Sequence, residues 1–159
     1  MVSILIPTHN REEFLAEAIE SVLAQDYPAL ELLVLDDGST DGTPEIAERY
    51  ARSHPSAFRW TRHENMGQAR TLNRGFELAR GELLGYLSDD DALVPGAVTA
   101  VAGALIEDPE AVVAYPAWHY VDEQGEIVDT YTPIEYSVVD SGKPAARIAL
   151  RVSSWERAV

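Results

Sequence analysis

Cysteine is absent from the 159-residue sequence, which excludes disulfide bonds and thiolate metal sites and fits a reducing cytoplasm. Long apolar runs are absent too. The longest, residues 97–106, is interrupted by Thr99 and Gly103 and falls short of the roughly 18–20 residues that span a bilayer. We therefore expect no transmembrane segment in this chain and a cytoplasmic location, with peripheral association at the inner face of the membrane left open.

Positive charge is scarce, because 12 lysine and arginine residues stand against 27 aspartate and glutamate residues and give a net charge of −15. A surface this acidic repels nucleic acid and anionic lipid, so we expect no nucleic-acid partner. A phosphate-bearing ligand would have to bind through local hydrogen-bond donors, a few basic residues or a bound cation. The remaining composition, 46% hydrophobic and 25% charged, is that of one globular domain.

Short apolar runs alternate with segments whose apolar residues recur at helical spacing. Strands are expected at residues 2–7, 30–35, 58–63 and 83–87, and helices at residues 11–25, 43–52, 66–80 and 95–106. Asn10 is the expected N-cap of the first helix, and Gly81 the C-terminal cap of the third. This alternation predicts an α/β fold, with a mostly parallel, Rossmann-like sheet covered by helices on both faces in three α/β/α layers.

The last third of the chain is less regular. Residues 111–121 and 126–131 are expected to form a hairpin, and residues 143–152 a helix. The chain then ends soon afterwards, at Val159, so a fragment of a longer protein is expected.

Three of the expected strands end in polar clusters, which are Thr8-His9-Asn10, Asp36-Asp37 and Ser88 to Asp91. In an open parallel sheet, ligands bind outside the carboxyl ends of the strands, near the point where the strand order reverses. All three clusters should lie at that edge of the sheet. Their convergence carries more weight than any one motif.

Asp36-Asp37-Gly38-Ser39 has two readings that the sequence leaves open. The first is a turn with acids that cap the following helix. The second is a ligand site, in which a carboxylate after the second strand accepts hydrogen bonds from a ribose hydroxyl or a base N–H.

Asp89-Asp90-Asp91 is a run of like charges at the end of a buried strand. A solvated loop could carry these acids. A divalent cation would turn their repulsion into attraction, since Mg²⁺ and Mn²⁺ favour carboxylate oxygens and fill their shells with substrate phosphates. We favour the metal, which would also bring a diphosphate to an acidic protein.

His9 and Arg70 are further candidates with competing interpretations. His9 follows the first strand, where a planar nucleobase could stack on its ring, although a lone histidine is usually a polar surface residue. Arg70 lies early in its helix and could bind phosphate, or it could belong to a solvated helix face.

Five motifs in this order resemble the family 2 glycosyltransferases, and the similarity runs from residue 2 to about residue 130. They are Val2-Ser3-Ile4-Leu5-Ile6-Pro7-Thr8-His9-Asn10, Asp36-Asp37-Gly38-Ser39-Thr40-Asp41-Gly42, Asn65-Met66-Gly67, Gly81-Glu82 and Ser88-Asp89-Asp90-Asp91. The resemblance implies a GT-A fold. It also implies transfer of a sugar from a nucleotide diphosphate sugar, often uridine-linked, to an acceptor hydroxyl with inversion and with help from Mn²⁺ or Mg²⁺.

The resemblance also implies roles for individual residues. Pro7, Thr8, His9 and Asp37 are expected to bind the nucleoside, with Asp37 reading the base. Asp89 is expected beside the ribose and diphosphate, while Asp90, which closes the family's Asp-any-Asp motif, and Asp91 are the expected metal ligands. The acceptor would be a glycan or a lipid-linked molecule, as in bacterial synthesis of cell-envelope polysaccharide.

Two positions depart from the family pattern. Ser88 stands where the first aspartate of the Asp-any-Asp motif is usual, and Thr71-Leu72-Asn73-Arg74-Gly75 replaces the usual Ala-Arg-Asn-x-Gly run. The acidic motif that supplies the family's catalytic base has no match before Val159, so the catalytic residue is unassigned. Residues 1–130 are expected to be the nucleotide-sugar-binding core, and residues 131–159 the truncated start of an acceptor-side segment.

Other functions remain as alternatives. A non-catalytic nucleotide-sugar-binding module, or a donor-binding fragment without the base, would keep the same motifs. A response-regulator-like domain needs acids after the first strand and a lysine after the fifth, and the only lysine is Lys143. Dinucleotide-dependent oxidoreductases and sugar-nucleotide pyrophosphorylases need a glycine-rich loop after the first strand, where Thr8-His9-Asn10 stands.

Overall fold

The computed structural model describes residues 1–122, 124–131 and 147–152. Strands and helices alternate through the first two thirds of the chain, and short strands follow. The elements are β1 (Val2–Thr8), α1 (Leu15–Leu23), β2 (Leu30–Asp36), α2 (Thr43–Ser53), β3 (Phe58–Arg62), α3 (Gln68–Leu78), β4 (Leu83–Leu87), α4 (Ala97–Glu107), β5 (Val113–Ala114), β6 (Trp118–Val121), β7 (Ile127–Tyr131) and β8 (Arg147–Val152).

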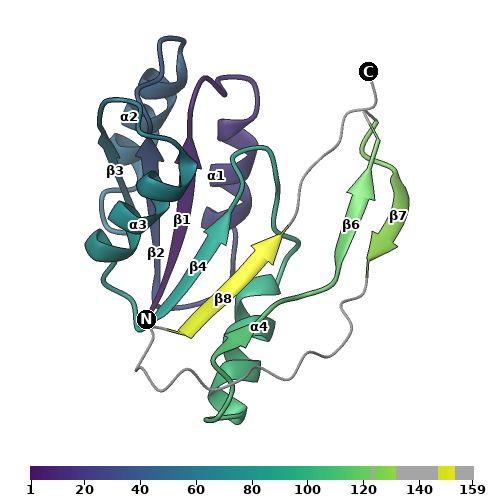
Figure 1. Cartoon of the computed structure of the whole chain (residues 1–159). Coiled ribbons are helices and arrows are strands. Elements are labelled where there is room, and N and C mark those ends of the chain that lie inside the picture. The colour runs from purple at the N-terminus through teal and green to yellow at the C-terminus, as the bar shows by residue number, and fades with distance from the viewer. Residues whose placement is uncertain (123, 132–146, 153–159) are drawn as a thin grey trace.

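Six strands form one sheet in the order β3-β2-β1-β4-β8-β5, and every pairing within it is parallel (Figure 1). The strand order runs outward from β1 to β3 on one side and starts again with β4 on the other. The switch point therefore lies between the carboxyl ends of β1 and β4, where a parallel sheet opens a crevice for ligands.

Helices cover both faces of the sheet, as the sequence predicts. Because successive strand residues point to opposite faces, Ile4 and Ile6 of β1 join one core and Leu5 joins the other. The larger core packs β1 and β2 against α1, α2 and α4, and the smaller one packs Leu5 and its neighbours on β2 against Leu72 and Phe76 of α3. The predicted three-layer α/β/α architecture is confirmed.

Gly75 lets α3 lie close to the sheet. A Cβ atom at this position would come within 2.3 Å of Leu35 Cδ1 and 2.6 Å of Leu5 Cδ2. Real Cβ contacts are never this short, so any larger residue would push the helix or the two leucines away. The close approach places the first turn of α3 beside the carboxyl ends of β1 and β2.

Glu31 anchors the other end of α3 although it is only 6% exposed. Its carboxylate accepts hydrogen bonds from the Ser3 hydroxyl, the backbone N–H of Arg80 and the guanidinium of Arg59. Burial raises the pKa of Glu31, but these hydrogen bonds and the Arg59 charge outweigh burial and leave the pKa below its ordinary value. The residue is therefore a buried anion with its charge compensated.

Two predicted helix caps are wrong. The first helix begins at Leu15 rather than Arg11, and Asn10 adopts φ 54°, a left-handed conformation outside the helix. Its backbone N–H is held by Ser39 Oγ, so the loop cannot turn into a helix there. Gly81 is not the cap of α3, since the C-cap position is Ala79 and the Gly81 N–H donates to Ser3 Oγ.

The C-terminal part differs most from the sequence prediction. Residues 147–152, expected within a helix, form β8, which pairs with β4 and β5; the rest of that expected helix lies outside the described residues. Ile148, Leu150 and Val152 alternate with period two, a strand pattern that outweighs the helix-forming alanines.

The predicted hairpin is confirmed for β6 and β7, which pair antiparallel and stand apart from the main sheet in Figure 1. The first predicted strand of that hairpin is divided, because residues 113–114 form β5 in the main sheet. Pro116, which has no N–H to donate, lies between β5 and β6. No helix in the described ranges is long and apolar enough to cross a membrane.

Candidate functional site

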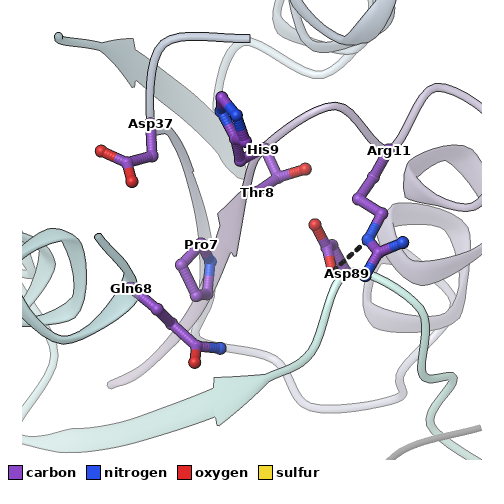
Figure 2. Close-up of a pocket in the computed structure, with 7 residues that line it drawn as sticks. All are labelled: Pro7, Thr8, His9, Arg11, Asp37, Gln68 and Asp89. Atoms are coloured by element: carbon purple, nitrogen blue, oxygen red, sulfur yellow. Dashed lines mark ion pairs between the residues drawn. The ribbon is translucent and has the colours of Figure 1, made fainter. Parts of the chain in front are cut away.

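A hollow of about 230 Å³ opens at the switch point between β1 and β4. This volume is below the roughly 300–1,000 Å³ of pockets that enclose a whole ligand, so the hollow is an open cleft that would cover part of one. Figure 2 shows Arg11 and Asp89 facing each other at one end, with Asp37 and Gln68 on the other side of Pro7. The lining residues are Pro7, Thr8, His9, Arg11, Asp37, Gln68 and Asp89.

Asp37, which directly follows β2, is held by the two residues that precede α3. Its Oδ1 accepts the backbone N–H of Met66 at 2.8 Å, and its Oδ2 accepts that of Gly67 at 2.9 Å. Burial raises the pKa of Asp37, but these two bonds, a hydrogen bond from Thr71 and the nearby His63 together leave it below its ordinary value. Asp37 is therefore an ionised carboxylate in a fixed orientation at neutral pH.

His63 and Thr71 form the wall behind Asp37. His63 Nε2 lies 3.0 Å from Thr71 Oγ1 and 3.3 Å from Asp37 Oδ1, and only 7% of the His63 side chain is exposed. These contacts fill the side of the carboxylate that faces the protein. Neither residue stood out in the sequence, because nothing local marks a histidine or threonine that packs behind an acid 26 or more positions away.

Gly38 allows the loops around Asp37 to meet. Its φ is +77°, and a Cβ here would lie 2.9 Å from the backbone nitrogen of Asn65. Only glycine combines that backbone conformation with so close a contact.

Asp36 supports the first interpretation of its motif, since it is completely buried and its Oδ1 accepts the Ser39 N–H at 2.9 Å. The two adjacent aspartates thus have different environments. Asp36 closes the turn after β2, whereas Asp37 reaches the cleft.

Five backbone N–H groups donate hydrogen bonds between residues 10–12 and residues 39–43, and we call this pair of segments the rim. The backbone N–H groups of Asn10, Arg11 and Glu12 donate to Ser39 Oγ, Thr43 Oγ1 and Asp41 Oδ2, respectively. In return, the N–H groups of Thr40 and Gly42 donate to the side chains of Asn10 and Glu12. The rim fixes where His9 and Arg11 stand.

His9 lies on the exposed side of the cleft. Asn10 Nδ2 is 3.2 Å from His9 Nε2, and Asn65 Nδ2 is 3.4 Å from His9 Nδ1. The imidazole is thus flanked by two amides while it remains accessible to a planar ligand.

Asp89 follows β4 and forms the opposite wall, with 13% of its side chain exposed. Burial raises the pKa of Asp89 and the charge of Asp90 raises it further, while contacts with Thr8, Arg11 and His9 lower it by less. Arg11 Nε lies 3.7 Å from Asp89 Oδ1. This end of the cleft has two neighbouring acids and one cation.

Gln68 was missed in the sequence and is the first residue of α3. Its Nε2 donates to the Tyr86 hydroxyl at 2.8 Å, and that hydroxyl is 3.2 Å from Ser88 Oγ. The chain of contacts runs from the cleft to the residue before Asp89. Its position directly after the Asn65-Met66-Gly67 motif was the only available signal.

The structure brings most predicted nucleotide-binding residues together. Five of the six line the cleft, namely Pro7, Thr8, His9, Asp37 and Asp89. The sixth, Arg70, is exposed on α3 and lines a separate hollow with Asn73 and Glu77. Arg11, which the sequence analysis did not select, occupies the place by the cleft that Arg70 was expected to hold.

The two predicted metal ligands differ in accessibility. Asp90 is half-buried, and Asp91 is 3% exposed with its N–H donated to the Ser88 carbonyl. Within the part of the chain that the structure describes, no three His, Cys, Asp or Glu residues cluster as a complete metal cage.

The comparison with protein families decides what kind of protein carries this cleft. The model described as glycosyl transferase family 2 matches residues 3–143, which is most of the chain. The chain belongs to glycosyl transferase family 2. The resemblance read from the five motifs is confirmed.

Relatives of this family 2 chain support the same assignment. Chondroitin synthase from Escherichia coli is 32% identical over 128 residues, which make up 80% of this chain and 18% of that protein. TarS from S. aureus, solved in complex with UDP-GlcNAc, is 26% identical with a TM-score of 0.67, over 80% of this chain and 36% of the solved one.

A third relative is the mannosyltransferase PcManGT from Pyrobaculum calidifontis, solved in complex with GDP-Man and Mn²⁺. It is 29% identical with a TM-score of 0.65, and the match covers 77% of this chain and 35% of that one. These structures confirm that the family 2 chain has the GT-A fold. The chain spans well under half the length of each of the three relatives.

Proposed function

We propose that this chain is the donor-binding part of a glycosyltransferase that moves a sugar from a nucleotide diphosphate sugar to an acceptor hydroxyl with inversion. The observation that carries the proposal is the convergence of Asp37, His9 and Asp89 at the switch point, from three different strand ends. A nucleotide sugar needs three kinds of group. These are a hydrogen-bond acceptor for a base N–H, a ring on which the base can stack, and acids near the ribose and the diphosphate.

The hydrogen bonds of Asp37 favour a uracil base. Oδ1 accepts the Met66 N–H and lies beside His63, while Oδ2 accepts the Gly67 N–H and is the oxygen proposed to accept one further donor. Uracil offers a single N–H between two carbonyls. Guanine offers two adjacent N–H groups and would need a carboxylate with both oxygens free, so we propose a UDP-linked donor.

Asp89, Asp90 and Arg11 form the diphosphate side in this proposal. Mg²⁺ and Mn²⁺ are usually held by one or two protein carboxylates together with substrate phosphates, and the adjacent acids Asp90 and Asp91 suit such a shared site. Asp90 and Asp91 remain the proposed ligands, and Asp90 is the more accessible of the two. The metal would supply positive charge that stabilises the departing diphosphate.

The described residues around the cleft are proposed to position the donor. The rim and Asp37 orient the nucleoside, and Arg11 places positive charge beside the phosphates. In an inverting reaction, the acceptor hydroxyl loses its proton to a base while it attacks the anomeric carbon opposite the leaving diphosphate. That base is not assigned to any of the described residues, so donor binding without transfer is the alternative function of the isolated chain.

The acceptor is proposed to be a glycan or a lipid-linked molecule, and the location the cytoplasm or the inner face of the membrane. The names of two relatives, a chondroitin synthase and a mannosyltransferase, support a sugar or sugar-bearing acceptor.

Calorimetric titration of UDP tests the proposal. We expect binding with Mn²⁺ that falls at least about tenfold, or about 1.4 kcal/mol, when EDTA replaces the metal and in Asp90→Ala with Mn²⁺ present. GDP under the same conditions should bind more weakly than UDP. Failure of UDP, GDP and TDP alike to bind would show that the cleft does not accept a nucleotide, whereas tighter GDP binding would overturn only the choice of uracil.

A further inference from the structure

Tyr86 joins the two sides of the cleft. It lies on β4, half-buried, and its hydroxyl contacts Gln68 of α3 on one side and Ser88 on the other. Gln68 lines the cleft and follows Gly67, whose N–H is bonded to Asp37. Ser88 directly precedes Asp89 at the diphosphate side.

The direction of the first of these two hydrogen bonds follows from which atoms carry hydrogens. Gln68 Nε2 can only donate, so the Tyr86 oxygen accepts at 2.8 Å. The single hydrogen of the Tyr86 hydroxyl is then available for Ser88 Oγ at 3.2 Å. Either hydroxyl can donate in this contact; in the arrangement where Tyr86 donates, Ser88 Oγ accepts and its own hydrogen is left for a third group.

No other partner for Ser88 Oγ occurs in the part of the chain that the structure describes. A phosphate oxygen is a pure acceptor, and a protein of net charge −15 has few donors to offer it. The ribose hydroxyls, by contrast, can donate to the Asp89 carboxylate. The donor that Ser88 presents therefore suits the diphosphate better than the sugar of the nucleoside.

We propose that Gln68, Tyr86 and Ser88 form a hydrogen-bond relay that turns the Ser88 hydroxyl toward a diphosphate oxygen of the bound nucleotide. Ser88 contacts the ligand in this proposal, and Tyr86 and Gln68 are positioning residues that act through it. The proposal rests on the proposed function, because it needs a nucleoside diphosphate in the cleft. It adds an uncharged donor to a region otherwise built from acids and Arg11.

The test is UDP affinity, measured by calorimetry with Mn²⁺ on the wild-type chain and on variants of the relay. Ser88→Ala and Tyr86→Phe should each weaken UDP binding about fivefold to tenfold, as expected for loss of about 1–1.4 kcal/mol in one hydrogen bond to a charged group. Ser88→Thr keeps the hydroxyl and should restore affinity to within about threefold of wild type, or about 0.65 kcal/mol.

Two comparisons separate a relay from a loss of structure. The double variant Gln68→Ala/Tyr86→Phe should bind UDP no more weakly than Tyr86→Phe alone, because members of one network are not additive. Tyr115→Phe, a tyrosine that is 37% exposed and lies away from the cleft, should bind like wild type. Thermal unfolding of each variant confirms that it is folded.

The outcomes distinguish the relay from the proposed function. If the wild-type chain binds UDP and Ser88→Ala binds it equally tightly, the relay is wrong and the proposed function stands. The same holds if Ser88→Thr is as weak as Ser88→Ala, or if the effects of Gln68→Ala and Tyr86→Phe simply add. A wild-type chain that binds no UDP overturns the proposed function, and the relay with it.

Discussion

The backbone N–H of Gly67 donates to Asp37 Oδ2 at 2.9 Å, and this bond joins the end of β2 to the start of α3. The neighbouring Met66 N–H does the same to Oδ1. The carboxylate proposed to read the nucleobase is therefore also the group that holds the first turn of a helix. Stability and ligand binding share the same two oxygen atoms.

Asp37→Asn should consequently weaken both properties. The amide nitrogen carries hydrogens and would face one of the two backbone N–H groups, which leaves that donor unsatisfied at a cost of about 1–3 kcal/mol in the free energy of unfolding. UDP affinity should fall more than about tenfold. Urea denaturation and calorimetry measure the two effects. Asp108→Asn is the control, since exposed Asp108 accepts a single backbone N–H beyond α4; equal losses in both variants would contradict the shared role.

Arg11 and Arg70 offer a direct test of which arginine serves the phosphates. Arg11 lines the cleft beside Asp89, whereas Arg70 lies in another hollow. Arg11→Ala should lower UDP affinity about fivefold to twentyfold, most at low salt, because a partly exposed charge is screened by ions. Arg70→Ala should change it by less than about twofold. A larger loss of UDP affinity in Arg70→Ala than in Arg11→Ala, measured by calorimetric titration, would indicate that Arg70 binds the phosphates.

Gly75 and Gly103 should respond oppositely to the same substitution. Gly75→Ala forces a methyl group onto Leu5 and Leu35 and should reduce the free energy of unfolding by about 1–3 kcal/mol. A Cβ at Gly103 of α4 meets nothing within 4 Å, so Gly103→Ala should raise stability by about 0.5–1 kcal/mol through better helix propensity. Urea denaturation measures both. A stabilising Gly75→Ala would mean that α3 can move away from the sheet without penalty.

Stability should depend on pH through Glu31. Its pKa is lowered in the folded chain from an ordinary value of 4.5, so the ionised form contributes stability that is fully present above about pH 4.5. Below that value the unfolded chain binds a proton first, and the contribution is lost as pH falls through the folded pKa. Wild type should therefore lose stability more steeply than Glu31→Gln between about pH 5 and pH 3 in urea denaturation. Glu82→Gln, at an exposed position, should follow wild type.

The regular part of the fold was predictable because its signals are local. The apolar run of β1 and the helical spacing of α1 are patterns of neighbouring residues. The alternation of strands with helices then favours a parallel sheet. The strand ends then had to converge. For this reason, the sequence predicts that Thr8, His9, Asp37 and Asp89 lie at one edge of the sheet, and all four line the cleft.

The errors share a physical cause, which is a partner distant in sequence. Asn10 looked like a cap, but Ser39 and Thr40, 29 and 30 positions away, determine its conformation. The strand β8 depends on pairing with β4, more than 60 positions earlier, rather than on its own propensity. Arg11 falls within the helix expected at residues 11–25, whereas the structure places it in a non-helical loop before α1, beside Asp89.

The rim gives the free protein a preorganised binding surface. Hydrogen bonds from five backbone N–H groups between residues 10–12 and 39–43 already hold the backbone around His9 and Arg11 before a ligand arrives. A flexible loop would lose about 1–2 kcal/mol of conformational entropy per residue on ordering, and that loss would be subtracted from the affinity. In this protein the loops are already ordered when the chain folds, so the entropic loss does not reduce the affinity for the nucleotide. Association therefore needs no loop closure and should proceed in a single kinetic phase.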